Sequence, residues 1–324
     1  MYAIETKNLT KKFGEITAVN KISLKIKKGE LFGLLGPNGA GKTTFISMLC
    51  TILQPTYGDA FVWGYDIKKQ KNEVRKSIGI VFQDPSLDQN LTAKENLDFH
   101  ARLYGMERKK REKRIKEVLD LVELSDKADI LVKTFSGGMR RRLEIARGLM
   151  HLPKILFLDE PTLGLDPQTR RKIWEYISRL KKEEGITIIL TTHYMEEADY
   201  LCDRIGIIDH GRIIALNSPE NLKSAMGGDV VYLRADKPES LLELFECDGK
   251  IDEDGRIRIT TQDGESFIPK ILEIARERGI EVYSIGIRKP TLEDVFIHLT
   301  GKDIREEKGS ILERRREIVR ARFR

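Results

Sequence analysis

Runs of apolar residues in the first two thirds of the chain predict a buried parallel sheet. The runs are Leu31–Leu35, Ile78–Phe82, Ile155–Asp159 and Thr187–Thr191. Short runs that do not alternate with polar residues are typical of strands buried on both faces. Because helical stretches separate the runs, we expect an α/β fold.

Two other patterns surround this sheet. Alternating apolar and polar residues predict antiparallel strands at Ile4–Leu9, Lys21–Ile26 and Ala60–Trp63. Residues 86–150 have helical spacing and many charges, so we expect a helical subdomain there. Within it, Glu107–Lys116 has charges at i,i+4 spacing and no aromatic residues, which favours a solvated helix face over a nucleic-acid patch.

A second domain is predicted after the turn-forming segment Asn217-Ser218-Pro219. The pattern that follows is strand, helix, strand, strand, helix and strand, at 230–235, 239–245, 250–252, 256–260, 266–278 and 281–288. This βαββαβ order predicts a small ferredoxin-like α+β domain. We therefore expect a first domain at 1–220, an accessory domain at 228–301 and a basic tail at 302–324.

The first apolar run leads directly into a glycine-rich segment. The segment matches G-x-x-x-x-G-K-[ST] and consists of Gly36, Pro37, Asn38, Gly39, Ala40, Gly41, Lys42, Thr43 and Thr44. In such a P-loop, backbone N–H groups surround phosphate oxygens, the lysine adds positive charge and the next hydroxyl can bind Mg²⁺. A helix that begins at Lys42 directs its positive end toward the same anion. A chance glycine loop is the alternative, but strand, glycines, lysine and threonine all occur together here.

Polar residues follow the other three apolar runs, namely Gln83, Glu160 and His193. Because ligands bind beyond the carboxyl ends of parallel strands, we expect these residues at the same edge as the P-loop. Asp159 is expected to hold Mg²⁺ through water or Thr43, and Glu160 to act as a general base or to orient water. The alternative is that both carboxylates only cap the next turn.

A second candidate anion site comprises Ser136, Gly137 and Gly138, which stand just before a predicted helix. One nucleotide does not need two such sites from one subunit. We therefore expect this one to close over a nucleotide that is held by a second copy of the chain. Taken alone, the segment would be interpreted as an ordinary helix N-cap with a glycine turn.

In this order and spacing, the P-loop, Gln, Ser-Gly-Gly, Asp-Glu and His motifs resemble the nucleotide-binding subunit of an ABC transporter over roughly residues 1–220. SGGMRRRLEIARGL and PTLEDVFIHLTG further resemble the daunorubicin-resistance-like multidrug exporter branch. Phe135 and Met139 replace the Leu and Gln that are commoner at these positions of the signature motif. Because Ser136 and both glycines are retained, we expect detailed contacts at this motif to differ while the ATPase activity is kept. The resemblance therefore implies an α/β fold with an ABC-type P-loop NTPase core, an antiparallel β subdomain and a helical subdomain, followed by the expected accessory α+β domain.

The resemblance implies an ATPase with ATP and Mg²⁺ as cofactors. It also implies a dimer with a second copy of the chain, which powers export through a separate integral membrane permease. The expected location is the cytoplasm, peripheral on the inner face of the cell membrane.

Four residue roles come from this resemblance alone. Phe13 matches the aromatic residue that stacks on adenine, and His193 matches the histidine that holds the γ-phosphate. Gln83 matches the residue that senses Mg²⁺ and contacts the permease. Asp166 lies in Leu163-Gly164-Leu165-Asp166, which matches the loop that communicates across the dimer.

Composition limits the classes of protein to which the chain can belong. The 324 residues are 40% hydrophobic and 33% charged, which indicates a globular protein with two domains. The scattered Cys50, Cys202 and Cys247 favour a reducing compartment and give no metal site. No apolar run is long enough for a signal or a membrane span, so a membrane role requires a partner.

Charge argues against a nucleic-acid partner. Of the net charge of +6, residues 302–324 contribute +4, so the rest of the chain is nearly neutral. The rival classes are a soluble ABC ATPase of translation or DNA repair and a P-loop kinase or GTPase. An ABC ATPase of translation or DNA repair would usually carry two cassettes or a long coiled coil, and this sequence has neither. A GTPase would carry an N-K-x-D motif, which the sequence lacks, and neither a kinase nor a GTPase explains Ser-Gly-Gly together with Asp-Glu.

The basic tail carries one further hypothesis. Ser310 and Glu313 form a capping box, and a basic amphipathic helix is expected over 310–323. Such a helix would contact the permease or the anionic inner leaflet. Docking on its own C-terminal domain, or a frayed end, is an equal alternative.

Overall fold

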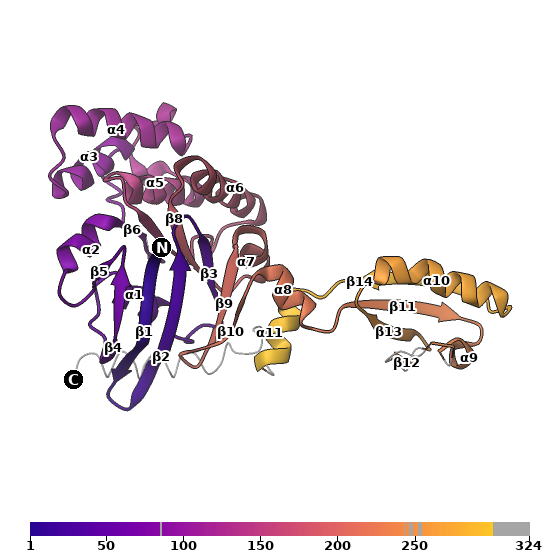
Figure 1. Ribbon diagram of the computed structural model, residues 1–324. Coiled ribbons are helices and arrows are strands. Elements are labelled where there is room, and N and C mark those ends of the chain that lie inside the picture. Colours follow the sequence, from indigo (N-terminus) through magenta and orange to yellow (C-terminus); the bar gives the residue numbers. More distant parts are fainter. Residues whose placement is uncertain (85, 243, 246–248, 252–254, 301–324) are drawn as a thin grey trace. The chain divides into compact units, whose positions relative to one another are not determined.

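Figure 1 shows the computed structural model of the protein, which describes residues 1–84, 86–242, 244–245, 249–251 and 255–300. Within this range the chain forms two compact units, residues 1–216 and residues 217–300. The expected tail helix and Cys247 lie outside the described residues. None of the described helices is long and apolar enough to cross a lipid bilayer.

The first unit contains a six-stranded sheet with the order β10-β9-β3-β8-β7-β6. Its strands are β3 (Leu31–Leu35), β6 (Ile78–Val81), β7 (Ile155–Asp159), β8 (Thr187–Thr192), β9 (Arg204–Asp209) and β10 (Arg212–Asn217). β3 pairs in parallel with β8 and β9, and β7 pairs in parallel with β6 and β8. The predicted buried parallel sheet is therefore confirmed.

An antiparallel sheet with the order β2-β1-β4-β5 lies beside it. The strands are β1 (Tyr2–Phe13), β2 (Ile16–Lys27), β4 (Tyr57–Val62) and β5 (Tyr65–Asp66). β1 and β2 are each 12 residues long, so they extend well beyond the predicted Ile4–Leu9 and Lys21–Ile26. Helix α1 (Lys42–Leu49) packs against both sheets, with Phe45 and Met48 fully buried in a shared core.

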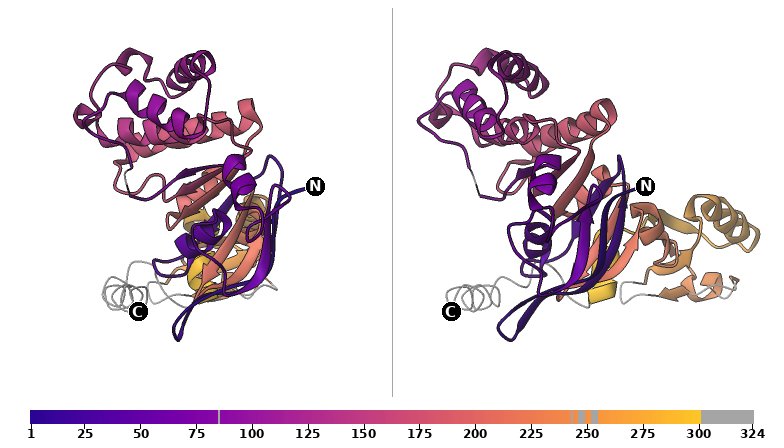
Figure 2. Two further views of the ribbon diagram at one scale, coloured as in Figure 1. Left: turned by 90° about the vertical axis from the view of Figure 1, so that its left-hand side faces the viewer. Right: turned by 60° about the vertical axis from the view of Figure 1, so that its left-hand side comes forward.

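The first unit contains further helices besides α1. They are α2 (Lys71–Ser77), α3 (Ala93–Leu103), α4 (Arg108–Leu121), α5 (Gly137–Leu149), α6 (Pro167–Glu184) and α7 (Met195–Leu201), with 3₁₀ turns at Ser125–Lys127 and Val132–Thr134. Figure 2 shows α3, α4 and α5 grouped at the end of the unit away from the antiparallel sheet. Helix α4 is mostly exposed and its Arg108 pairs with Glu112, as predicted for a solvated helix face.

The second unit has its own sheet, with the order β12-β13-β11-β14 and antiparallel neighbours throughout. Its elements are α8 (Pro219–Ser224), β11 (Asp229–Ala235), α9 (Pro238–Leu242), β12 (Gly249–Ile251), β13 (Ile257–Thr261), α10 (Gly264–Glu277), β14 (Val282–Arg288) and α11 (Leu292–Thr300). This order is that of the predicted ferredoxin-like domain. Val231 and Ile259 of the sheet pack with Ile271 of α10 in a separate core.

Candidate nucleotide site

The P-loop joins β3 to α1 and can follow its path only with glycine at two positions. A Cβ atom on Gly36 would lie 2.3 Å from the carbonyl oxygen of Ile208. Gly41 has a φ of 105°, and a Cβ there would lie 2.2 Å from the carbonyl oxygen of Ala18. The loop is therefore held tightly against β9 and the start of β2, which fixes its N–H groups at the N-terminus of α1.

Lys42 lies at the centre of this loop and is only 4% exposed. Its ammonium donates to the carbonyl oxygens of Gly36 at 2.8 Å and Pro37 at 3.0 Å. It also lies 3.4 Å from Oε1 of Glu160. Burial lowers the pKa of Lys42, although the nearby carboxylate opposes this shift. Phosphate oxygens are stronger partners for a buried ammonium than neutral carbonyls, so the loop suits an anionic ligand.

Glu160 follows β7 in a left-handed backbone conformation, with a φ of 47°. Its backbone N–H donates to both the carbonyl and the hydroxyl oxygen of Thr191, each at 3.1 Å. The carboxylate lies between Lys42 and His193, whose Nδ1 is 3.3 Å from Oε2. Burial alone would raise the pKa of Glu160, but His193 and Lys42 together lower it. A buried, ionised carboxylate is thereby held beside the phosphate loop.

Asp159 is 2% exposed at the end of β7. Its carboxylate accepts hydrogen bonds from the hydroxyls of Thr191 and Thr43. Burial raises the pKa of Asp159 because it disfavours the charged carboxylate, and a bound cation would oppose this shift. These oxygen donors fit Mg²⁺. No cluster of three or more His, Cys, Asp or Glu side chains that could hold a metal ion occurs among the described residues.

Gln83 and Phe13 each follow or end a strand of the first unit. Gln83 follows β6, next to β7, and is half-buried, but no hydrogen bond within the described chain joins it to Asp159 or Thr43. Phe13 ends β1 and is 9% exposed, with the ammonium of Lys11 5.0 Å from its ring centre. Their roles at a metal and at adenine remain predictions.

The Ser136 segment lies at a different place in the same unit. Ser136 caps α5 by accepting from the N–H of Met139 at 3.3 Å, and Asp166 caps α6 by accepting from that of Thr169 at 3.0 Å. A Cβ on Gly138 would lie 2.4 Å from Cγ2 of Thr169, so this glycine permits the close approach of α5 and α6. Where the structure describes the chain, neither Ser136 nor Asp166 bonds to Lys42 or Glu160. Their contact with nucleotide stays a prediction.

Arg141 is a site-supporting residue that no sequence pattern singled out. Its guanidinium is buried and donates to the carbonyl oxygens of Phe82 at 2.6 Å, Pro161 at 2.7 Å and Asp159 at 3.0 Å. It also forms an ion pair with Glu144 at 2.8 Å. Arg141 therefore ties helix α5 to the ends of both β6 and β7.

Glu197 is a second buried charge that sequence reasoning missed. Its Oε1 accepts from the hydroxyl of Thr162 at 2.7 Å and from Nε1 of Trp174 at 2.9 Å. The side chain is fully buried, and burial raises its pKa. Glu197 thus fixes the loop after Glu160 against α6 and α7. The sequence alone carries no signal for this role, because Glu197 is one of several acidic residues in α7 and only the fold shows which one is buried.

This arrangement defines a P-loop nucleoside triphosphatase. A phosphate loop, a metal-binding carboxylate and a second carboxylate beside a histidine all meet at the carboxyl ends of parallel strands. Comparison with known proteins narrows the class. Residues 19–163 match the family described as ABC transporter, and residues 218–300 match the family described as ATP-binding protein DrrA1-3-like, C-terminal domain.

Three relatives span nearly all of the chain. The linearmycin resistance ATP-binding protein LnrL of Bacillus subtilis is 40% identical, over 94% of this chain and 100% of its own length. The daunorubicin/doxorubicin resistance ATP-binding protein DrrA of Streptomyces peucetius is 40% identical, over 92% of each chain. The Nod factor export ATP-binding protein I of a Rhizobium species is 40% identical, over 93% of this chain and 98% of its own.

Solved structures match the first unit. CbiO1 of Clostridium perfringens, part of the ABC transporter complex CbiONQ, has a TM-score of 0.64 and 32% identity, over 68% of this chain and 90% of its own. The dimeric ATP-binding cassette MJ0796 bound to ADP and Pi has a TM-score of 0.60 and 32% identity, over 66% of this chain and 98% of its own. The chain belongs to the ABC transporter family, as an ATP-binding subunit with ATPase activity.

Proposed function

We propose that two copies of this chain bind two ATP molecules between them, and that closure of the dimer drives export through a separate membrane permease. The observation that supports the proposal most directly is that the two candidate phosphate-binding segments of one chain, the P-loop and the Ser136 helix N-terminus, are not joined to each other by a hydrogen bond or ion pair among the described residues. The P-loop and catalytic carboxylates lie together, whereas the second anion-binding helix N-terminus, at Ser136, makes no bond to them within the described chain. The dimeric structure of MJ0796 and the names of the resistance and export relatives support both parts.

Each residue then has a defined task. The P-loop N–H groups and Lys42 hold the phosphates, and Phe13 stacks on adenine. Thr43, Asp159 and Gln83 would hold Mg²⁺, which neutralises phosphate charge. Glu160 orients the attacking water and accepts its proton, while His193 contacts the γ-phosphate.

The second copy completes the site. Ser136, Gly137 and Gly138 of the partner subunit donate to the γ-phosphate, and Asp166 communicates between the two sites. ATP bridges the two subunits through this phosphate and ADP does not. That differential affinity is what can shift an equilibrium between open and closed dimers.

The location follows from the permease. The subunit would lie in the cytoplasm, at the inner face of the membrane, where the permease presents its cytoplasmic loops. A soluble machine of translation or DNA repair is the rival, and it would have ribosomal or nucleic-acid partners instead.

Affinity purification of the tagged full-length chain from detergent-solubilised source cells tests the proposal. We expect stoichiometric recovery of an integral membrane protein with about six apolar spans of roughly 20 residues each. Recovery of only soluble ribosomal or DNA-repair proteins would contradict it. The Glu160→Gln variant serves as a second bait, because it would still bind ATP and the permease but would not hydrolyse ATP.

A further inference from the structure

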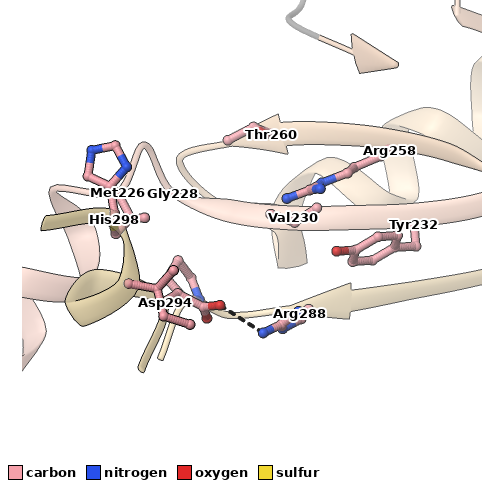
Figure 3. A pocket seen from close by; sticks show the side chains of 11 residues that line it. Met226, Gly228, Val230, Tyr232, Arg258, Thr260, Arg288, Asp294 and His298 are labelled. Atoms are coloured by element: carbon pink, nitrogen blue, oxygen red, sulfur yellow. Dashed lines mark hydrogen bonds and ion pairs between the residues drawn. The ribbon is translucent and has the colours of Figure 1, made fainter. Parts of the chain in front are cut away.

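One face of the sheet in the second unit is open. Alternate residues of β11 and β13 are buried in the core with α10, namely Val231, Leu233, Ile257 and Ile259. Their neighbours lie on the opposite face and line a cavity of about 310 Å³, together with residues of β14: Val230, Tyr232, Arg258, Thr260 and Arg288 (Figure 3). Small-molecule sites span roughly 300–1,000 Å³, so this cavity suits a small ligand.

Helix α11, the connection from β14 to α11 and the segment before β11 form the walls of the cavity. They contribute Met226, Pro290, Asp294, Ile297 and His298. Among the described residues, Asp294 is the only carboxylate in the lining. Its Oδ1 already accepts from Arg288 at 2.8 Å, and its Oδ2 accepts from the N–H and hydroxyl of Thr291. The negative charge of Asp294 is therefore compensated inside the unit.

Positive charge on the open face is not compensated in this way. The guanidinium of Arg258 lies 5.8 Å from the ring centre of Tyr232 and has no carboxylate partner in the described part of the chain. Its cross-strand partner on β12 is Lys250, a second exposed cation without an ion pair there. Like charges directly opposite each other destabilise a sheet, and a bound anion would remove that repulsion.

Gly286 leaves space beside Tyr232. The two residues are cross-strand partners on β11 and β14. A Cβ on Gly286 would have no atom within 4 Å, and the backbone there is not left-handed, so neither packing nor conformation requires glycine. The backbone of β14 at Gly286 is therefore not covered by a side chain, and a planar ring of a ligand could pack there against the half-buried Tyr232 ring.

We propose that this cavity binds a small aromatic carboxylate. Its ring would lie against Tyr232 and over Gly286, and its carboxylate would be bound by Arg258 with support from Lys250. The apolar side chains of Val230 and Ile297 would contact the rest of the ring system. Every residue of this site belongs to the second unit, so the proposal is independent of the proposed export function.

The test uses the full-length protein with ADP and Mg²⁺ in excess, so that the nucleotide site is occupied. The probe is 2-naphthoate, and the neutral 2-naphthamide serves as its matched control. Isothermal titration should show saturable binding of 2-naphthoate at submillimolar concentration, and binding of the amide should be at least tenfold weaker because the charge pair is missing.

Variants then assign the binding to this cavity. Arg258→Gln and Gly286→Leu should each weaken 2-naphthoate binding at least tenfold, the first through charge and the second by filling the space. Arg276→Gln, at an exposed position of α10 on the other side of the sheet, should leave binding unchanged. Absence of saturable binding to the folded protein would overturn the proposal. Equal affinity in the wild type and Arg258→Gln would also overturn it, even if Gly286→Leu failed to fold.

Discussion

At the scale of single residues, the site depends on a carboxylate that is kept charged in a buried place. Glu160 has a φ of 47°, which costs free energy in a residue with a large side chain. Two bonds from its N–H to Thr191 hold this conformation, and Lys42 and His193 hold the charge. The strain thus directs the carboxylate toward the P-loop, where it can act on water.

Glu160→Gln tests that role. The change preserves shape but removes the negative charge, so ATP hydrolysis should fall by about 10²- to 10⁴-fold, as expected for loss of a general base. ATP affinity, measured by equilibrium binding, should remain within about threefold because the residues that bind the phosphates are unchanged. Glu175→Gln, an exposed change on α6, is the control. Wild-type turnover in Glu160→Gln would remove Glu160 from the mechanism.

Phe13→Ala tests the proposed adenine contact. Base–aromatic stacking contributes about 1–3 kcal/mol, so ATP and GTP affinity should fall together by a similar amount. Because Phe13 is largely buried, the variant must also be compared with the wild type in a thermal melt. Unchanged nucleotide affinity in a destabilised variant would assign Phe13 to packing alone.

At the scale of elements, helix α5 and the ends of β6 and β7 form one connected group through Arg141. This single guanidinium donates to three backbone carbonyls and forms the ion pair with the buried Glu144, whose other oxygen accepts from the N–H of Ser86. The helix that begins at Ser136 is therefore fixed to the strands that carry Gln83 and Glu160. Movement of one should be transmitted to the other.

Arg141→Ala should lower the free energy of unfolding by about 3–5 kcal/mol, because it leaves a buried charge without its partner. Arg171→Ala, on the exposed face of α6, should change it by less than about 0.5 kcal/mol. Urea unfolding of both variants gives the comparison. If Arg141→Ala lowered the free energy of unfolding by less than about 1 kcal/mol, water would be replacing the hydrogen bonds and the ion pair of Arg141.

The sequence was sufficient to predict the secondary-structure elements whose apolar and polar residues follow a regular pattern. It was not sufficient to predict side-chain contacts that arise only on folding. β3 and β7 are nearly continuous apolar runs and β8 has an apolar centre between threonines, so the residues at the ends of these strands could be assigned to one edge from topology alone. β1 and β2 were predicted too short because their ends are partly exposed and lose the alternation. Arg141 stands between two other arginines in a helix, so nothing local distinguishes the one that is buried.

At the scale of the whole molecule, the two units have separate cores, and all nucleotide-site residues described above belong to the first. Calorimetry of the full chain should therefore resolve two transitions. ATP·Mg²⁺ at 100 times its Kd stabilises the folded form that binds it by about 2.7 kcal/mol. It should raise the Tm of the first unit by about 5–10 °C and leave the second unchanged. A single transition that shifts as a whole would show that the units unfold together.

The composite site between two copies is the central claim, and the mass of the Glu160→Gln protein in solution tests it most directly. With ATP and Mg²⁺, light scattering should give twice the 37.2 kDa of one chain, whereas ADP should leave a monomer. Adding Ser136→Arg should abolish the dimer while ATP binding to each monomer persists, because the changed side chain acts only on the nucleotide of the other copy. A Glu160→Gln protein that stays monomeric while saturated with ATP, or a dimer that is indifferent to Ser136→Arg, would contradict the account.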